Sequence, residues 1–465
     1  MSDSPRDYDL ICIGSGPAGQ RGAVQAAKLG RRVAVVERRH VVGGACVEVG
    51  TIPSKTLREA IVRLGAAANV PGTVRLPRRR PTAAELVSRI GEVQANETEV
   101  ITDQLERNHV DVLCGAAEFV DPHRLAVTGP HGRREVTAAN FLIATGTDAA
   151  PLRGITPDGQ VVLTSDHIGE LPVLPRQLAV VGAGVIGIEY ASMFAQLGVA
   201  VTLVDRRARP LEFVDNEIVD ELLHQMRARN VSFRFGESVD RLEVGAGASR
   251  AATLWLESGK KIVADMVLFS VGRVGATDTL ALDRAGVQVD DRGRVAVDAQ
   301  FRTNVAHIYA AGDVIGYPSL AATSSEQGRL AACHALGVAA PPMSAHFPIG
   351  IYAVPEISMV GETEETLTKA KIPYEVGVAR YGEIARGQIL GDHSGFFKML
   401  FHRENRRLLG VHIIGTQATE LLHIGQAVLG LGGGLDYFLT TVFNYPTLAE
   451  CYKVAALNAA NKMAA

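Results

Sequence analysis

Residues 9–37 read DLICIGSGPAGQRGAVQAAKLGRRVAVVE and decide the fold of the first part of the chain. An apolar run leads into a Gly-x-Gly-x-x-Gly motif, and an alanine-rich segment suited to a helix follows it and stops at Gly30. A second apolar run then ends in Glu37. The glycines of the motif are Gly14, Gly16 and Gly19. This pattern predicts a strand, a tight turn, a helix and a second strand parallel to the first.

Residues 178–205, LAVVGAGVIGIEYASMFAQLGVAVTLVD, repeat the arrangement with glycines at Gly182, Gly184 and Gly187. In both copies an acid, Glu37 or Asp205, lies 23 positions after the first glycine. With 48 glycines in 465 residues, about 0.5 matches to a lone motif arise by chance, so the surrounding pattern carries the inference. Glycines let the backbone approach a pyrophosphate, and the acid accepts hydrogen bonds from ribose hydroxyls. The chain is therefore predicted to contain two dinucleotide-binding folds.

The composition is that of a globular protein with about three domains. The chain has 47 Lys and Arg against 50 Asp and Glu, a net charge of −3, which argues against a nucleic-acid partner. The short run Arg78-Arg79-Arg80 is interpreted as an exposed loop.

Nothing in the sequence indicates export or a membrane partner. Residues 1–7 lack the apolar core of a secretory signal, and the apolar stretch 178–188 is shorter than the ~20 residues that span a bilayer. Five scattered cysteines without a Cys-x-x-Cys pair favour a reducing compartment and no metal site. We expect a cytoplasmic protein.

Segment 43–55, GGACVEVGTIPSK, completes a constellation with the two folds and with three apolar runs that end in glycine, at Gly146, Gly272 and Gly312. The whole chain resembles the flavoprotein disulfide reductases. The resemblance implies an α/β protein with two Rossmann-like FAD/NAD(P)-binding domains and a C-terminal α+β dimerisation domain, assembled as a homodimer or a larger homo-oligomer. The implied limits are 1–150 and 276–345 for the FAD domain, 151–275 for the NAD(P) domain and 346–465 for the dimerisation domain.

The same resemblance implies FAD as cofactor of the first fold, with NAD and NADP as substrates at the second. Glu37 would contact the adenosine ribose of FAD, and Asp313 its ribityl chain. The implied cofactor-binding residues are Gly14, Gly16, Gly19, Glu37, Gly44, Cys46, Thr51, Lys55, Ala117, Thr145, Gly146, Gly312, Asp313, Gly182, Gly184, Gly187, Glu189, Asp205, Arg206, Arg207 and Gly272.

The chain departs from this family at two positions. Disulfide reductases carry two cysteines separated by four residues before Ile-Pro-Ser-Lys, but here the second position, next to the flavin, is Thr51, so Cys46 stands alone. A hydroxyl forms neither a disulfide nor a thiolate. Near the C-terminus, Tyr445 replaces the histidine that serves the thiols as acid and base, and a phenol of pKa ~10 is a poor proton shuttle at neutral pH. Both changes argue against disulfide reduction.

The flavin–nicotinamide half of the family site survives. Lys55 and Glu189 are the implied catalytic residues, paired beside the flavin and the nicotinamide; the alternative is an ordinary surface lysine and an ordinary helix-start glutamate. With no disulfide to reduce, the simplest hydride acceptor is a second nicotinamide. We therefore expect FAD-dependent hydride transfer between NADPH and NAD, in a ping-pong cycle.

The end of the second fingerprint fits a site that both nucleotides visit. Asp205 suits the free ribose hydroxyls of NAD, and Arg206 and Arg207 suit the 2′-phosphate of NADP. The alternative is that both arginines are merely solvated.

Two other functions stay open. One is a divergent reductase of the lipoamide dehydrogenase type, or an NAD(P)H:quinone diaphorase, in which Cys46 acts alone or with a distant thiol. The other is a non-catalytic flavin-binding redox sensor, which the intact Lys55 and Glu189 disfavour.

Overall fold

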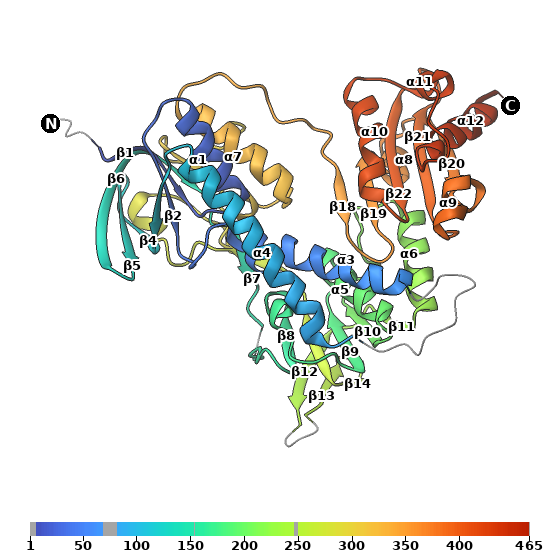
Figure 1. Ribbon diagram of the computed structural model, residues 1–465, viewed down its shortest axis with the longest axis horizontal. Helices are drawn as coiled ribbons and strands as arrows, with labels where there is room; N and C mark the ends of the chain where they lie inside the picture. The colour runs from blue at the N-terminus through green and yellow to red at the C-terminus, as the bar shows by residue number, and fades with distance from the viewer. Residues whose placement is uncertain (1–5, 68–80, 153, 246–249, 465) are drawn as a thin grey trace.

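The computed structural model describes residues 6–67, 81–152, 154–245 and 250–464, and Figure 1 shows them as three parts. A first sheet with its helices lies at the left, a second sheet lies below, and the C-terminal part lies at the upper right. The arginine run 78–80 and residues 1–5 lie outside the described residues. In the described ranges no helix is both long and apolar enough to cross a membrane.

The first sheet has strand order β3-β2-β1-β6-β5-β4, with β17 paired to β6. β1 runs parallel to β2 and β6, and β4, β5 and β6 form an antiparallel extension. β17 follows the second fold in sequence, so the chain returns to complete the first sheet, and α1 and α7 pack against each other. The elements are β1 (Tyr8–Ile13), α1 (Pro17–Lys28), β2 (Val33–Glu37), α2 (Gly44–Glu48), α3 (Thr51–Ala67), α4 (Ala83–Glu106), β3 (Asp111–Cys114), β4 (Ala116–Asp121), β5 (Arg124–Gly129), β6 (Gly132–Ile143), β17 (Ile308–Ala310) and α7 (Ala321–Ala335).

The second fold has an entirely parallel sheet, in the order β11-β10-β9-β15-β8, with a three-stranded antiparallel sheet, β12-β13-β14, beside it. An antiparallel ribbon of β7 and β16 connects it to the first fold. The elements are β7 (Thr147–Ala149), β8 (Val162–Thr164), β9 (Gln177–Val181), α5 (Val185–Gln196), β10 (Ala200–Asp205), α6 (Asn216–Ala228), β11 (Val231–Phe235), β12 (Val239–Val244), β13 (Ala252–Leu256), β14 (Lys261–Ala264), β15 (Met266–Phe269) and β16 (Arg273–Gly275).

The C-terminal part is an antiparallel sheet, β18-β19-β22-β21-β20, covered by helices. The sequence pattern predicts a helix over residues 447–462, but the helix starts only at Glu450, because the residues around Pro446 form a bend. The elements are β18 (Ile349–Ile351), β19 (Ile357–Gly361), α8 (Glu364–Ala370), β20 (Tyr374–Arg380), α9 (Ala385–Leu390), β21 (Phe396–His402), β22 (Leu408–Ile414), α10 (Ala418–Gly430), α11 (Leu435–Thr440) and α12 (Glu450–Ala464).

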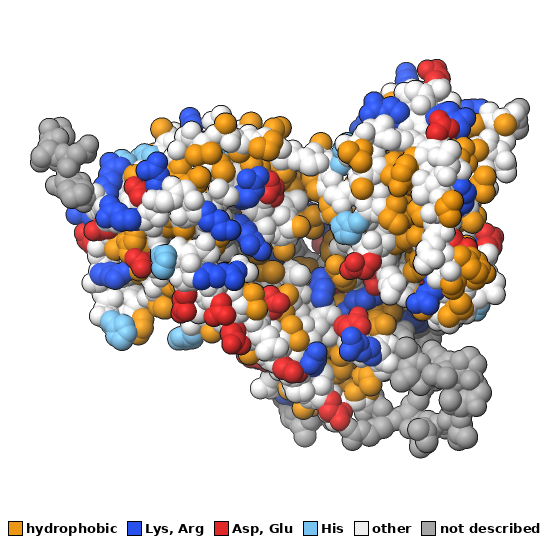
Figure 2. Space-filling view, turned by 45° about the horizontal axis from the view of Figure 1, so that its top comes forward, with side chains coloured by type: hydrophobic (Ala, Val, Ile, Leu, Met, Phe, Trp, Pro, Cys, Tyr) orange, Lys and Arg blue, Asp and Glu red, His pale blue; other side chains and the backbone are white. Residues whose placement is uncertain are grey.

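Helix α3 joins the three parts through one apolar core. Its buried Leu57 and Ile61 share this core with Val180 of the second sheet and Ile351 of the C-terminal part. The surface in Figure 2 mixes positive and negative side chains over the first two parts, as the net charge of −3 suggests.

An ion cluster around a buried lysine holds the second fold to the C-terminal part. Lys398 of β21 is fully buried, and its ammonium lies 3.0 Å from Asp215 Oδ1 and 2.7 Å from Glu217 Oε2 at the start of α6, and also contacts Glu364. Burial disfavours the ammonium, but the three carboxylates outweigh this and hold the pKa of Lys398 above its ordinary value.

We expect Lys398→Met to destabilise the protein by about 3–5 kcal/mol, because it leaves the buried carboxylate of Asp215 without its cation. Thermal melts at one scan rate will measure this against Arg89→Met, which breaks the exposed pair between Arg89 and Glu92 and costs at most ~1 kcal/mol. Equal melting temperatures for the two variants would contradict the structural role of the cluster.

Candidate functional site

A cavity of about 1060 Å³ lies where the three parts meet. Its wall includes the turn after β1, segment 44–55, the start of α5 and residues 347–352. Of the residues singled out in the sequence, those lining it are Gly14, Gly16, Glu37, Gly44, Cys46, Thr51, Lys55, Ala117, Thr145, Gly146, Glu189, Gly272, Gly312 and Asp313. Those that do not line it are Gly19, Gly182, Gly184, Gly187, Asp205, Arg206 and Arg207.

The first glycine motif builds a turn that other residues fit poorly. Gly14 has φ +104°, and a Cβ on Gly19 would lie 1.8 Å from the carbonyl oxygen of Gly14. Gly16 is different, because a Cβ there would meet nothing within 4 Å. Gly16 also caps α1 without a side-chain hydrogen bond, so backbone N–H groups at the start of this helix are available for an anion.

The second motif repeats this geometry. Gly182 has φ +105°, and a Cβ on Gly187 would lie 1.8 Å from the Gly182 carbonyl oxygen. Gly184 again faces open space and begins α5 without a side-chain cap. The two folds therefore present equivalent helix N-termini.

The two fingerprint acids also stabilise the protein itself, which the sequence reading missed. Glu37, 4% exposed, accepts hydrogen bonds from Ser15 N, Ser15 Oγ and Arg39 N. Asp205, 6% exposed, accepts a hydrogen bond from Ala183 N. Each acid thus ties the strand-end residue to the residue after the first glycine of its own motif.

Lys55 and Glu189 form an ion pair in the cavity wall. Lys55 Nζ lies 2.8 Å and 3.0 Å from the two carboxylate oxygens of Glu189, which is 3% exposed. The backbone N–H of Tyr352 donates a 2.8 Å hydrogen bond to Glu189 Oε1, and the ammonium lies 5.0 Å from the Tyr352 ring centre. The ammonium of Lys55, from the first part, is therefore held by Glu189 of the second part and Tyr352 of the C-terminal part.

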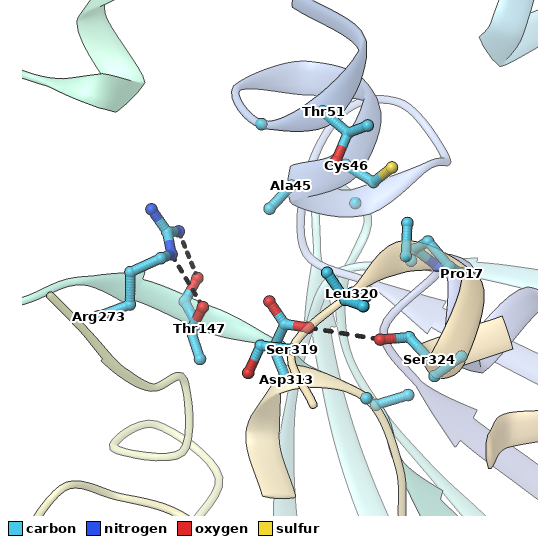
Figure 3. Close-up of a pocket in the computed structure, with 18 of the residues that line it drawn as sticks. Pro17, Ala45, Cys46, Thr51, Thr147, Arg273, Asp313, Ser319, Leu320 and Ser324 are labelled. Atoms are coloured by element: carbon cyan, nitrogen blue, oxygen red, sulfur yellow. Dashed lines mark hydrogen bonds between the residues drawn. The ribbon is translucent and has the colours of Figure 1, made fainter. Parts of the chain in front are cut away.

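A second group of polar side chains in the cavity wall surrounds Asp313, and Figure 3 shows Arg273, Thr147 and Ser324 around it. Burial raises the pKa of Asp313, and Arg273 partly opposes this shift. Arg273 itself is held by Thr147, through bonds of 2.9 Å to Oγ1 and 2.7 Å to the carbonyl oxygen, and by Asp166 at 3.1 Å. Arg273 directly follows the apolar run that ends at Gly272, and no spacing rule in the sequence indicates its partners.

Cys46 and Thr51 lie side by side at the top of Figure 3, from α2 and the first turn of α3. Burial raises the pKa of the Cys46 thiol, and the hydroxyl of Thr51 offsets this only in part. All five cysteines of the chain are free thiols. The thiol of Cys46 is therefore held in its protonated form at neutral pH.

Tyr445 is not part of the cavity of a single chain. It is 68% exposed, on the segment between α11 and α12, and neighbouring Val442 is 93% exposed. Glu450 has a buried Oε2 without a partner among the described residues.

The cavity fits FAD on evidence beyond its glycines. Thr145 Oγ1 is buried in its wall with no hydrogen-bond partner among the described residues, so a ligand hydroxyl or phosphate would satisfy it. The uncapped start of α1 suits a pyrophosphate, and the Lys55 ammonium suits a ring that gains negative charge.

Family models match nearly all of the chain. Residues 8–328 match the pyridine nucleotide-disulphide oxidoreductase family, and residues 347–456 match its dimerisation domain. Soluble pyridine nucleotide transhydrogenases from Mycobacterium tuberculosis and Klebsiella pneumoniae are 52% and 44% identical to the chain. These alignments cover 99% and 98% of this chain, and 98% and 99% of the relatives.

Solved structures agree with the family match. LpdA from Mycobacterium tuberculosis superposes with a TM-score of 0.88 at 27% identity, over 96% of this chain and 99% of that one. The HOCl-induced flavoprotein disulfide reductase RclA from Escherichia coli gives 0.87 at 26% identity, over 97% and 99%. The chain therefore belongs to the pyridine nucleotide-disulphide oxidoreductase family.

Members of this family bind FAD, and the expected α/β fold class with a C-terminal dimerisation domain is confirmed. The domain limits and the roles of individual site residues stay predictions.

The two open glycines separate the two nucleotide sites experimentally. Gly16→Val adds methyl groups at the start of α1 with a backbone, φ −65°, that valine tolerates, so we expect a folded protein whose FAD affinity falls at least about tenfold, or about 1.4 kcal/mol. The matched change Gly184→Val, at φ −76°, should keep FAD and weaken ADP-ribose. Flavin absorbance per chain and calorimetry measure the two effects, and full FAD content in Gly16→Val would contradict this placement.

Proposed function

We propose that this protein is an FAD-dependent transhydrogenase that transfers hydride between NADPH and NAD without a redox-active disulfide. Bound FAD supplies the two-electron carrier between the two nucleotides. NADPH binds and leaves as NADP before NAD enters the same site, so the kinetics are ping-pong.

One observation carries the proposal: the position next to Cys46 that a disulfide reductase fills with a thiol is Thr51, within a family member whose Lys55–Glu189 pair is intact. Disulfide reduction needs two exchanging thiols and a thiolate, whereas hydride transfer between nicotinamides needs orientation and electrostatics. Relatives at 52% and 44% identity are named soluble pyridine nucleotide transhydrogenases, which supports the same conclusion.

In this proposal Lys55 is the catalytic cation and Glu189 positions it. Hydride arriving from NADPH brings negative charge to this part of the cavity, and a fixed ammonium stabilises that charge without rearranging. Glu189 is held by Tyr352 N and therefore keeps the ammonium from turning toward water. No proton relay is required, so the loss of the family's histidine at Tyr445 does not impair the reaction.

The working unit is proposed to be a homodimer formed through the C-terminal part. The family match to a dimerisation domain over residues 347–456 supports this, and so does the exposure of Val442 and Tyr445 in a single chain. A larger assembly of such dimers is compatible with the proposal.

The direct test is hydride transfer from NADPH to thio-NAD by the purified, FAD-loaded protein, with lipoamide and a quinone as competing acceptors. We expect transfer to thio-NAD and parallel lines in double-reciprocal plots at several thio-NAD concentrations. Faster turnover of lipoamide or quinone would favour the reductase or diaphorase, and unreduced flavin after NADPH addition would favour a sensor.

We predict that Cys46 is dispensable. Because Thr51 supplies no second thiol, Cys46→Ser should keep most of the activity, and the two-electron-reduced wild type should show no long-wavelength thiolate–flavin absorption. Thr51→Cys is the matched change that restores a pair of cysteines, and the appearance of such a band there shows that the assay detects it. A thiolate band in the wild type, or an inactive Cys46→Ser protein with bound FAD, would refute a thiol-free mechanism.

Lys55→Met should slow flavin reduction by NADPH by about 100-fold, which corresponds to about 2.7 kcal/mol of lost stabilisation. The change removes the cation at similar volume and leaves buried Glu189 unpaired. Stopped-flow bleaching of the flavin measures this step alone. Lys55→Arg, which keeps the charge, should retain far more activity; equal losses in both variants would mean that the lysine acts through packing rather than charge.

A further inference from the structure

Both glycine fingerprints end in the same triplet, an acid followed by two arginines. The triplets are Glu37-Arg38-Arg39 in the first fold and Asp205-Arg206-Arg207 in the second. Their sequences suggest equivalent environments, but the arginines have different partners in the two folds.

In the first fold, both arginines form ion pairs with acids other than Glu37. Arg38 pairs with Asp148 at 2.8 Å, and the guanidinium of Arg39 pairs with Glu48. No described arginine side chain hydrogen-bonds to the carboxylate of Glu37, and its Oε1 accepts only the 2.9 Å bond from Arg39 N. This oxygen keeps capacity to accept a ribose hydroxyl.

In the second fold, the guanidinium of Arg207 turns back onto its own fingerprint acid. Arg207 Nε lies 3.0 Å from Asp205 Oδ1, and Nη2 lies 2.8 Å from Oδ2. Backbone N–H groups of Arg207 and Ala183 donate the remaining bonds, at 2.8 Å and 2.5 Å. A carboxylate offers about four acceptor positions, so Asp205 has no position left for a ribose hydroxyl.

Cationic donors nevertheless remain free at this strand end. Arg207 Nη1 has no hydrogen-bond partner among the described residues, and Arg206 is exposed and makes no ion pair with any of them. The second fold therefore combines a neutralised acid with unused guanidinium N–H groups.

We propose that Arg207 is a specificity-determining residue that masks Asp205, and that opening and closing of this pair lets one site accept both NADP and NAD. The inference rests on the proposed function, in which both nucleotides use the second fold. The closed pair is the state that takes NADP, and the open pair is the state that takes NAD.

Electrostatics distinguish the two states. A bare Asp205 carboxylate repels a 2′-phosphate, whereas the closed pair is neutral and adds Arg207 Nη1 and Arg206 as donors to that phosphate. The free ribose of NAD instead needs the carboxylate, so Arg207 must swing away first. The apparent affinity for NAD is therefore lowered by the fraction of molecules in which the pair is open.

The mask predicts opposite effects of one substitution. Arg207→Ala should tighten ADP-ribose by about 3–10-fold, since no closed pair has to open, and weaken 2′-phospho-ADP-ribose by about tenfold or more. Arg206→Ala, the neighbouring control, should weaken only the phosphorylated probe. Calorimetric titration of the FAD-loaded protein measures all four affinities.

Asp205→Asn tests the cause, because tightening of ADP-ribose by Arg207→Ala should disappear when no carboxylate is left to unmask. Arg207→Lys keeps the charge but not the bidentate contact with Asp205, so it should tighten ADP-ribose by a smaller factor than Arg207→Ala does. If Arg207→Ala does not fold, this variant provides the test of the mask. Unchanged ADP-ribose affinity, or equal weakening of both probes, overturns the mask. Neither probe carries a nicotinamide, so failure of hydride transfer to thio-NAD would reject the proposed function and leave this measurement valid.

Discussion

The ion pair between Lys55 and Glu189 is the contact on which the arrangement of the three parts depends. Glu189 is almost completely buried, and a buried carboxylate is costly unless its charge is matched and its oxygens are hydrogen-bonded. Lys55 comes from α3 of the first fold, and the backbone N–H of Tyr352 comes from the C-terminal part. The carboxylate is satisfied only when all three parts are assembled, so the same contact that builds the cavity also places its cation. Arg58, one turn further along α3, forms a second ion pair of this kind: its guanidinium lies 3.0 Å from the carboxylate of Glu356 in the C-terminal part.

The two nucleotide folds show which structural features follow from the glycine motif alone. Positive φ at the first glycine and close approach at the third are required for the turn itself, so the motif looks alike in both copies. The acid at the strand end ties that turn to the next strand in both copies as well. What differs is supplied from outside the motif. Asp148 and Glu48 neutralise the arginines of the first fold, whereas in the second fold Asp205 itself is the only acid among the described residues that forms an ion pair with either arginine. Under the proposed mask, nucleotide selectivity therefore depends on residues outside the glycine motif.

This explains which parts of the site could be predicted from the sequence. Periodicity and glycine spacing predict the parallel strands and the helix starts at Gly16 and Gly184. The family resemblance predicts the pairing of Lys55 with Glu189. The contacts of Arg273 and the cluster around buried Lys398 follow from neither, because each joins residues whose separation in the chain obeys no local geometry. A lysine inside the apolar run of β21 carries no sign, in sequence alone, that three carboxylates converge on it. Long-range charge pairs of this kind cannot be predicted from the sequence, because they depend on how the domains pack.

If no thiol has to be reduced, the chemical demands on this family's scaffold change in kind. A disulfide reductase must keep a thiolate, a proton shuttle and the shape of a second substrate site, whereas a transhydrogenase presents two substrates that share their reactive end. The nicotinamide half of the cavity then cannot discriminate, because both nucleotides are the same there. Discrimination has to come from the one place where they differ, the 2′ position of the adenosine ribose, and a site used by both cannot be strictly complementary to either. In the proposed mask the Asp205–Arg207 pair reads that position with both kinds of recognition chemistry, so selection moves from the reaction centre to the end of β10.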